Sequence, residues 1–184
     1  MPRNIEIKAR VDSIPLLRSR TAAIATEGPT EIFQDDTFFA CENGRLKLRA
    51  FPDGSGELIF YRRADAAGPK ESFYVRSPTH DPNGLRETLA LAYGVVGRVF
   101  KQRILFLVGR TRVHLDRVRD LGAFLELEVV MRDQEGPEIG MREAHDLMDR
   151  LGIEGGQLVE KSYIDLLETV MPRPGRPSSP LARG

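Results

Sequence analysis

In several segments of this chain, charged side chains recur at every second position and apolar side chains occupy the positions between them. Because side chains of a β-strand alternate between two faces, residues two apart share a face. A sheet built from these segments would have one charged and one apolar face. The charged rows are Asn4, Glu6 and Lys8; Arg45, Lys47 and Arg49; Lys101 and Arg103; Arg110, Arg112, His114 and Asp116; and Glu126 and Glu128.

For any one of these strands, a solvent-exposed face on an ordinary sheet is the simplest explanation. Two features of the whole set weigh against it. Exposed strand faces usually carry Thr and Ser, whereas here nearly every position is ionisable. The signs are also segregated, since residues 45–49 and 101–103 are basic and residues 126–128 are acidic. Like charges on one face repel each other unless a ligand or a strand of opposite sign compensates them.

A closed barrel with its charged faces turned inward would resolve this repulsion. Its apolar outer faces would pack against helices, and its lumen would hold a charged ligand. Basic strands suit phosphates, because Arg offers paired donors and Lys a compact charge. Acidic strands suit a hard cation such as Mg²⁺ or Mn²⁺, which binds carboxylate and phosphate oxygens. A polyphosphate with a metal would use both halves, although spacing alone leaves the ordinary sheet open as well.

The remaining pattern predicts an α+β domain, with short connections between strands that favour an antiparallel meander closed into an eight-stranded barrel. We expect one domain over residues 1–170 and a disordered tail over 171–184, which is rich in Pro, Arg and Ser. Strands are predicted at 4–11, 31–40, 44–51, 56–63, 71–77, 95–108, 110–116 and 123–131. Helices are predicted from Asp12 or Ser13 to about 26, and at 84–94, 138–151 and 156–170.

Composition narrows the partners and the compartment. The chain has 27 Lys plus Arg and 27 Asp plus Glu, a balance that argues against general attraction to nucleic acid or to an anionic membrane. Cys41 is the only cysteine, which excludes an intrachain disulfide and a cysteine-rich zinc site. No segment resembles a signal peptide or approaches the roughly 20 apolar residues of a membrane span. We therefore predict a cytoplasmic protein.

The order of the motifs resembles the CYTH superfamily, the triphosphate tunnel enzymes. This superfamily includes class IV adenylate cyclases, thiamine triphosphatases and inorganic triphosphatases. The resemblance extends from Asn4 to Leu167. The motifs at 114–128 and 161–167 look most like the bacterial class IV cyclase-like branch. The motifs are NIEIK at 4–8, QDDTFF at 34–39, LKLR at 46–49, KQR at 101–103, HLD with LGAFLELE at 114–128, and KSYIDLL at 161–167.

The resemblance implies an eight-stranded tunnel and assigns roles to matching positions. The metal ligands would be Glu6, Glu126 and Glu128, with Asp116 assisting. The catalytic set would comprise Glu6, Lys8, Glu126 and Glu128. The triphosphate would contact Lys8, Lys47, Arg49, Lys101 and Arg103, together with the weaker matches Arg63 and Arg112 and the C-terminal Lys161. The family motif ExExK has Asn4 in place of its first glutamate here, which leaves the number of metal ions open.

The implied activity is metal-dependent chemistry on a small organic triphosphate, with Mg²⁺ or Mn²⁺ as cofactor. A cyclase that converts ATP to cyclic AMP and pyrophosphate is the first expectation. A triphosphatase acting on thiamine triphosphate, tripolyphosphate or a nucleotide is the second. A tunnel that only binds a phosphorylated ligand is the third. A homodimer is compatible with the family, and neither nucleic acid nor a membrane is expected as a partner.

Some residues have structural explanations that compete with functional ones. His114 shares a face with Arg112 and Asp116, and a structural hydrogen bond to Asp116 competes with a catalytic role. Ser72 and Tyr74 alternate in their strand and are expected at the surface rather than in the tunnel. Packing is the expected role of the aromatic residues Phe38, Phe39, Phe124 and Tyr163.

Overall fold

The computed structural model describes residues 3–63 and 68–170, and for Arg63 it describes the backbone alone. The predicted tail at 171–184 therefore lies outside the described residues. Within them, eight strands and four α-helices give an α+β fold, the class that the sequence predicts. No helix in these ranges is long and apolar enough to cross a membrane.

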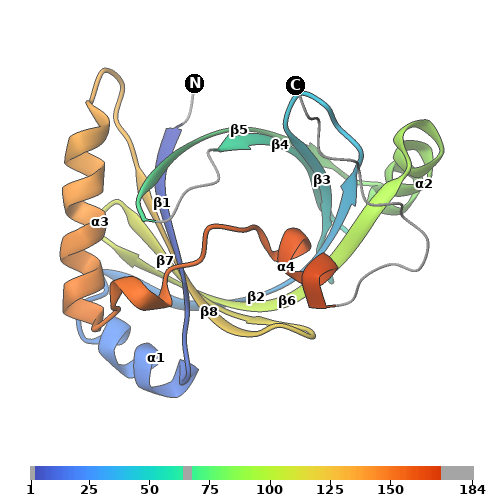
Figure 1. The fold of residues 1–184 in the computed structure, drawn as a ribbon. Coiled ribbons are helices and arrows are strands. Elements are labelled where there is room, and N and C mark those ends of the chain that lie inside the picture. Colours follow the sequence, from blue (N-terminus) through green and yellow to red (C-terminus); the bar gives the residue numbers. More distant parts are fainter. Residues whose placement is uncertain (1–2, 64–67, 171–184) are drawn as a thin grey trace, which may run out of the picture.

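The strands form a closed antiparallel ring in the order β1-β5-β4-β3-β2-β6-β7-β8 (Figure 1). This confirms the predicted closed eight-stranded barrel. The first strand closes the ring, because β1 pairs with β5 on one side and with β8 on the other. The strands are β1 (Arg3–Arg10), β2 (Glu27–Phe39), β3 (Arg45–Ala50), β4 (Gly56–Arg63), β5 (Lys70–Thr79), β6 (Val95–Val108), β7 (Thr111–Val118) and β8 (Gly122–Val130).

The helices lie outside the ring or across its mouth. They are α1 (Ile14–Ala22), α2 (Pro82–Tyr93), α3 (Pro137–Leu151) and α4 (Tyr163–Val170), with a short 3₁₀ turn at Gly155–Gln157. Figure 1 shows α1 and α3 on one side, α2 on the opposite side, and the segment leading to α4 across the ring opening. Side chains of Ser13 and Asp81 cap the first turns of α1 and α2, which fixes where these helices begin.

The largest apolar core lies between the ring and two of the helices rather than inside the ring. Alternate positions of β1, β7 and β8 face outward and pack against α1 and α3. The backbone of α3 lies close to β1 at Gly140, where an added Cβ would lie 2.6 Å from Ile5 Cγ1 and 2.4 Å from Met131 Sδ. The buried outward residues of the strands include Ile5, Ile7, Val113, Leu115, Leu125, Leu127 and Val129.

Three predicted boundaries were wrong, and all three errors arise from tertiary pairing. The first helix ends at Ala22 rather than near residue 26, and β2 begins at Glu27 rather than at 31, because this segment pairs with β6. The predicted helix at 156–170 is interrupted. The segment between the 3₁₀ turn and α4 pairs with β1 through an isolated bridge between Leu158 and Ala9 and a hydrogen bond from Val159 N to Lys8 O.

We predict that Leu151→Ala lowers the free energy of unfolding by about 3 kcal/mol, because the substitution leaves a cavity between α3 and the ring. Leu151 is 0% exposed and ends α3. Urea denaturation measures the effect. Leu91→Ala, on the outer face of α2 at 84% exposure, is the matched control and should cost less than about 0.5 kcal/mol. Equal losses in the two variants would contradict the placement of the core.

Candidate active site

The ring encloses a cavity of about 290 Å³. Every strand contributes side chains to it, and these include most of the charged rows recognised in the sequence. Three members of those rows do not line the cavity: Asp116 is buried behind it, Arg45 pairs with Asp165 of α4, and Arg110 precedes β7 and pairs with Glu135 and Glu143. Among the described lining residues, seven are Lys or Arg and four are Asp or Glu, so the cavity favours an anion. The charged lining residues are Glu6, Lys8, Asp36, Lys47, Arg49, Arg76, Lys101, Arg103, Arg112, Glu126 and Glu128.

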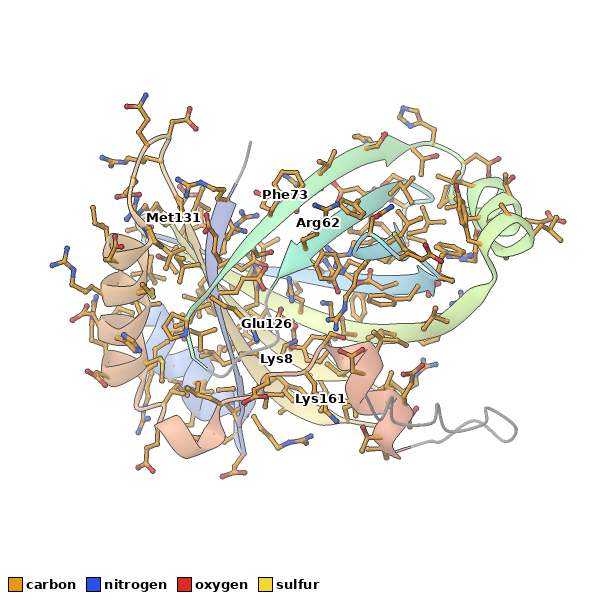
Figure 2. The ribbon with its side chains drawn as sticks, turned by 45° about the horizontal axis from the view of Figure 1, so that its top comes forward. Lys8, Arg62, Phe73, Glu126, Met131 and Lys161 are labelled. Atoms are coloured by element: carbon orange, nitrogen blue, oxygen red, sulfur yellow. The ribbon has the colours of Figure 1, made fainter. Side chains whose placement is uncertain are left out.

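The carboxylates predicted to bind a metal lie next to each other on β1 and β8. Register pairs Glu6 with Glu128 and Lys8 with Glu126. Lys8 Nζ lies 3.0 Å from Glu126 Oε1, and Figure 2 shows both side chains near the middle of the ring. Arg103 Nη2 donates to Glu126 Oε2 at 2.5 Å. Arg112 Nε lies 3.4 Å from Glu128 Oε2, so the two β8 carboxylates are both held by cations.

Asp116 lies behind the cavity lining, buried beside Arg103 with 0% exposure. It accepts two hydrogen bonds from Arg103, at 2.7 and 2.6 Å, and one from Tyr163 Oη at 2.9 Å. Lys101 Nζ lies 3.8 Å from it. These partners occupy both carboxylate oxygens, so Asp116 positions Arg103, while its predicted assistance to a metal stays a prediction.

Tyr163 does more than pack, contrary to the expectation for this aromatic residue. Its ring stacks edge-on against Phe124 with centroids 5.0 Å apart, and its hydroxyl donates to Asp116. Lys8 Nζ lies 4.0 Å and Lys101 Nζ 5.1 Å from the ring centroid, so two predicted phosphate-binding lysines face one aromatic ring. Burial, together with the charge of Asp116, raises the pKa of the Tyr163 hydroxyl well above its ordinary value, so it stays a donor.

Asp36 on β2 is a site residue that sequence reasoning missed. It accepts hydrogen bonds from Arg49 Nε at 2.7 Å, Arg49 Nη2 at 2.9 Å and Lys47 Nζ at 2.8 Å. Burial alone would raise the pKa of Asp36, but the charges of Arg49 and Lys47 hold it well below the ordinary value. The signal was present in the sequence, since Gln34, Asp36 and Phe38 alternate with outward residues in the way the basic rows do.

Lys101 and His114 have strongly lowered pKa values. Burial, helped by the neighbouring positive charge of Arg103, lowers the pKa of Lys101 to about 7. The same two causes lower the pKa of His114 to about 3, despite the opposing charges of Glu128 and Glu126. His114 is therefore a neutral imidazole near neutral pH, whereas Lys101 gains and loses its proton in that range.

Glu126 and Glu128 stay ionised at neutral pH. Burial opposes their ionisation, but Lys8 and Arg103 lower the pKa of Glu126 well below its ordinary value, and His114 and Arg112 lower that of Glu128. Ligand atoms of His114, Glu126 and Glu128 all lie within 4.8 Å of one another. Two carboxylates and a buried imidazole nitrogen form a donor set that fits a divalent metal ion.

The chain matches the family model of the CYTH domain over residues 2–163. It belongs to the CYTH domain family. Adenylate cyclase CyaB of Aeromonas hydrophila is 26% identical over 172 residues, which cover 89% of this chain and 88% of the relative. The PH1012 protein of Pyrococcus horikoshii OT3 has a similar structure, with a TM-score of 0.79 and 25% identity over 89% of this chain and 98% of that one.

Two further solved structures share the CYTH fold at lower identity. A candidate adenylate cyclase from Vibrio parahaemolyticus has a TM-score of 0.73 and 17% identity, and covers 90% of this chain and 97% of its own. HpAC1 from Hippeastrum, described as having a dominant triphosphatase activity, has a TM-score of 0.66 and 14% identity, with coverages of 95% and 98%. At these identities the likeness concerns the fold.

Three predicted residues of this CYTH domain remain: Arg112, Lys161 and Arg63. Arg112 lines the cavity and donates to Tyr74 Oη at 3.4 Å. The Lys161 side chain is exposed, while its carbonyl accepts from Lys8 Nζ at 3.4 Å, and Figure 2 shows Lys161 on the segment before α4. For Arg63 the structure describes the backbone alone, which pairs with Ser72. Their roles toward a triphosphate stay predictions.

The expected surface position of Ser72 and Tyr74 was wrong. Ser72 is 2% exposed, and both residues line the cavity with Arg76. The reason is ring closure, because β5 pairs with β1 as well as with β4 and its inward face has no access to bulk solvent from the side. For His114, the structural alternative of a hydrogen bond to Asp116 is not what the described residues show, because its Nδ1 approaches Glu126 and Glu128 instead.

We predict that Asp36→Asn lowers the free energy of unfolding by about 3 kcal/mol near neutral pH, because it leaves Lys47 and Arg49 without their shared carboxylate. The lowered pKa of Asp36 means that its contribution is present above the ordinary carboxyl value and is lost as pH falls through the folded-state value. Chemical denaturation at a series of acidic pH values should therefore show that the difference in free energy of unfolding between wild type and variant becomes smaller as pH falls.

Asp35→Asn is the matched control for this change. Asp35 is the adjacent residue on the outer face of β2 and pairs with Arg86 and the half-exposed Arg98. Because these ion pairs are partly open to solvent, this variant should lose about 1 kcal/mol or less. A smaller loss for Asp36→Asn than for Asp35→Asn would refute the inward clamp.

Proposed function

We propose that this chain is a metal-dependent enzyme that acts on an organic triphosphate inside the ring. The observation that supports it best is the division of the ring cavity into carboxylates on β1 and β8 and cations on β3 and β6. A metal-bound polyphosphate carries the charges that complement both sides. We also expect the protein to work in the cytoplasm, with Mg²⁺ or Mn²⁺ as cofactor.

The cations would bind and orient the phosphates. Arg49 and Arg103 are each fixed by paired hydrogen bonds to an aspartate, Asp36 and Asp116 respectively, so their remaining donors are held in place before the substrate enters. Donors fixed in advance stabilise the charge that develops on leaving phosphates at little reorganisation cost. Lys47 and Lys101 add point charges along the same wall.

Glu126 and Glu128, with Glu6 beside them, would hold the metal. A bound dication supplies Lewis-acid stabilisation of phosphate charge and a template that aligns nucleophile and leaving group. The residues themselves keep the carboxylates ionised, through Lys8, Arg103 and Arg112, and enclose the reacting phosphates away from bulk water. Phosphoryl-type displacement depends mainly on such positioning and electrostatics.

The first candidate reaction is cyclisation of ATP, in which the ribose 3′-hydroxyl attacks the α-phosphorus and pyrophosphate leaves. The relative named adenylate cyclase CyaB, at 26% identity over most of both chains, favours this reaction. The second candidate is hydrolysis, in which water attacks the terminal phosphorus of a triphosphate. The triphosphatase activity described for HpAC1 is the observation that favours this alternative.

We predict that purified protein with ATP and Mg²⁺ or Mn²⁺ yields cyclic AMP and pyrophosphate, measured by chromatographic separation of products. Orthophosphate would instead identify the triphosphatase, to be tested also with thiamine triphosphate and tripolyphosphate. Glu128→Ala should abolish product formation, because it removes a metal-binding carboxylate, and should leave the fold intact by circular dichroism.

The control for this variant is Glu87→Ala, which removes an exposed carboxylate on α2 outside the ring. It should leave the rate unchanged. Triphosphate binding without any product would favour the binding-only protein, and unchanged kinetics in Glu128→Ala would overturn the proposed site.

We predict that triphosphate binding takes up protons above neutral pH. The pKa of Lys101 is about 7 without ligand, so the amine is mostly neutral at about pH 8.5, and phosphate favours its charged form. Affinity should consequently fall as pH rises above 7. Calorimetric titration with tripolyphosphate in two buffers of different ionisation enthalpy measures the uptake, expected to approach one proton per site.

Lys101→Arg is the control for this linkage, because a guanidinium stays protonated throughout the range. It should bind tripolyphosphate with little proton uptake. Gln102→Ala, the neighbouring residue on the outer face of β6, should retain the wild-type uptake. Equal uptake in wild type and Lys101→Arg would exclude Lys101 as the source.

A further inference from the structure

His114 has a buried nitrogen that the surrounding protein does not satisfy. The residue is 4% exposed, and its Nδ1 has no hydrogen-bond partner among the residues that the structure describes. This nitrogen lies 3.8 Å from Glu128 Oε1 and 4.0 Å from Glu126 Oε2. A buried polar atom without a partner costs free energy, so such an atom inside a cavity indicates a missing ligand.

Neither protonation state of Nδ1 explains its position next to the two carboxylates. If Nδ1 carries a proton, both oxygens are too far away to accept a hydrogen bond. If it carries a lone pair, that pair faces two ionised carboxylates. A dication among the three atoms would satisfy them all, because a lone pair and two carboxylates are its ordinary ligands.

The spacing suits one metal ion. Donor atoms that each lie about 2.1 Å from an ion can be at most about 4.2 Å apart. The two separations from His114 Nδ1 fall below this limit, whereas the 4.8 Å within which all three ligand atoms lie is somewhat above it. Small side-chain rotations would complete the site without a change of backbone.

We propose that His114 is a nitrogen ligand of the tunnel metal and that the site therefore takes a first-row transition-metal dication in preference to Mg²⁺. Imidazole nitrogen is a good ligand for such metals, whereas Mg²⁺ takes carboxylate, phosphate and water oxygens. This inference rests on the proposed function for the presence of a metal, and adds its coordination and its identity.

The neighbouring contacts favour His114 and Glu128 as the tighter pair of ligands. Both oxygens of Glu126 already face cations, with Lys8 at 3.0 Å from one and Arg103 at 2.5 Å from the other. Among the residues that the structure describes, Glu128 has its ion pair with Arg112, at 3.4 Å through Oε2, and its Oε1 faces His114. The nitrogen therefore makes a large contribution to metal affinity.

The test uses Mn²⁺ as a paramagnetic probe in the full-length protein, alone and with tripolyphosphate. Electron spin-echo modulation should show a nitrogen nucleus coupled to the bound Mn²⁺. Labelling histidine side chains with ¹⁵N should convert the signal from the ¹⁴N to the ¹⁵N frequency, which assigns it to histidine. This measurement needs no substitution and no turnover.

Substitution then identifies which histidine is responsible. His114→Gln should remove the coupling and lower Mn²⁺ affinity about tenfold or more, while Mg²⁺ affinity changes by less than about threefold. His145→Gln, an exposed position on α3, is the matched control and should leave both unchanged. Calorimetry measures the affinities, and circular dichroism checks the folding of each variant.

The outcomes separate this inference from the proposed function. Two results would overturn it while leaving the enzyme proposal intact. One is Mn²⁺ that binds, with and without tripolyphosphate, but shows no coupling to histidine. The other is an equal loss of Mn²⁺ and Mg²⁺ affinity in His114→Gln. A protein that binds no Mn²⁺, either alone or with tripolyphosphate, would overturn it too. Histidine coupling in a protein that converts no triphosphate would support the ligand assignment and refute the enzymatic one.

Discussion

The pairing of opposite charges between neighbouring strands, on the inner face of the ring, is the interaction on which the structure depends. Charges removed from water cost several kcal/mol each unless partners compensate them. Arg103 meets Asp116 from the neighbouring strand, while Arg49 and Lys47 share Asp36. Because these partners lie on different strands, the charged rows are neutralised only when the strands pair, and closure of the ring adds the pair of Lys8 on β1 with Glu126 on β8. Closure also exposes the apolar rows to the helices, so one arrangement accounts for both faces of the sheet.

The same pairs prepare the cavity for an anion. Each fixed guanidinium has its orientation set by an aspartate, and Tyr163 fills the space between Lys8 and Lys101 at one mouth. An excess of cations remains after the pairs are formed, and this excess gives the cavity its preference for phosphate. The ion pairs thus make the walls rigid. The positive charge that remains unpaired is available to a bound anion.

Much of the fold and part of the site could be predicted from the sequence, because alternation reports directly which residues share a face. Alternation alone is enough to put Lys8, Arg103 and Glu126 on the charged faces that the ring turns inward. It missed Asp36, whose row contains Phe38 and is not uniformly charged, and Ser72, whose burial depends on the pairing of β5 with β1. The interruption before α4 was equally invisible, since its cause is a backbone contact with β1. Long-range pairing, rather than local pattern, decided each error.

The position of β1 has a consequence for how the chain is made. Its partners are β5 and β8, and Lys8 also donates to the carbonyl of Lys161, so the N-terminal strand has its full set of partners only when nearly the whole polypeptide is present. Contacts between such distant segments are slow to form, because loop-closure entropy must be overcome first. A ribosome-bound chain that stops short of Val130 has an open sheet with a bare edge and an unneutralised face. Completion of the last strand is therefore the event that commits the protein to its native state.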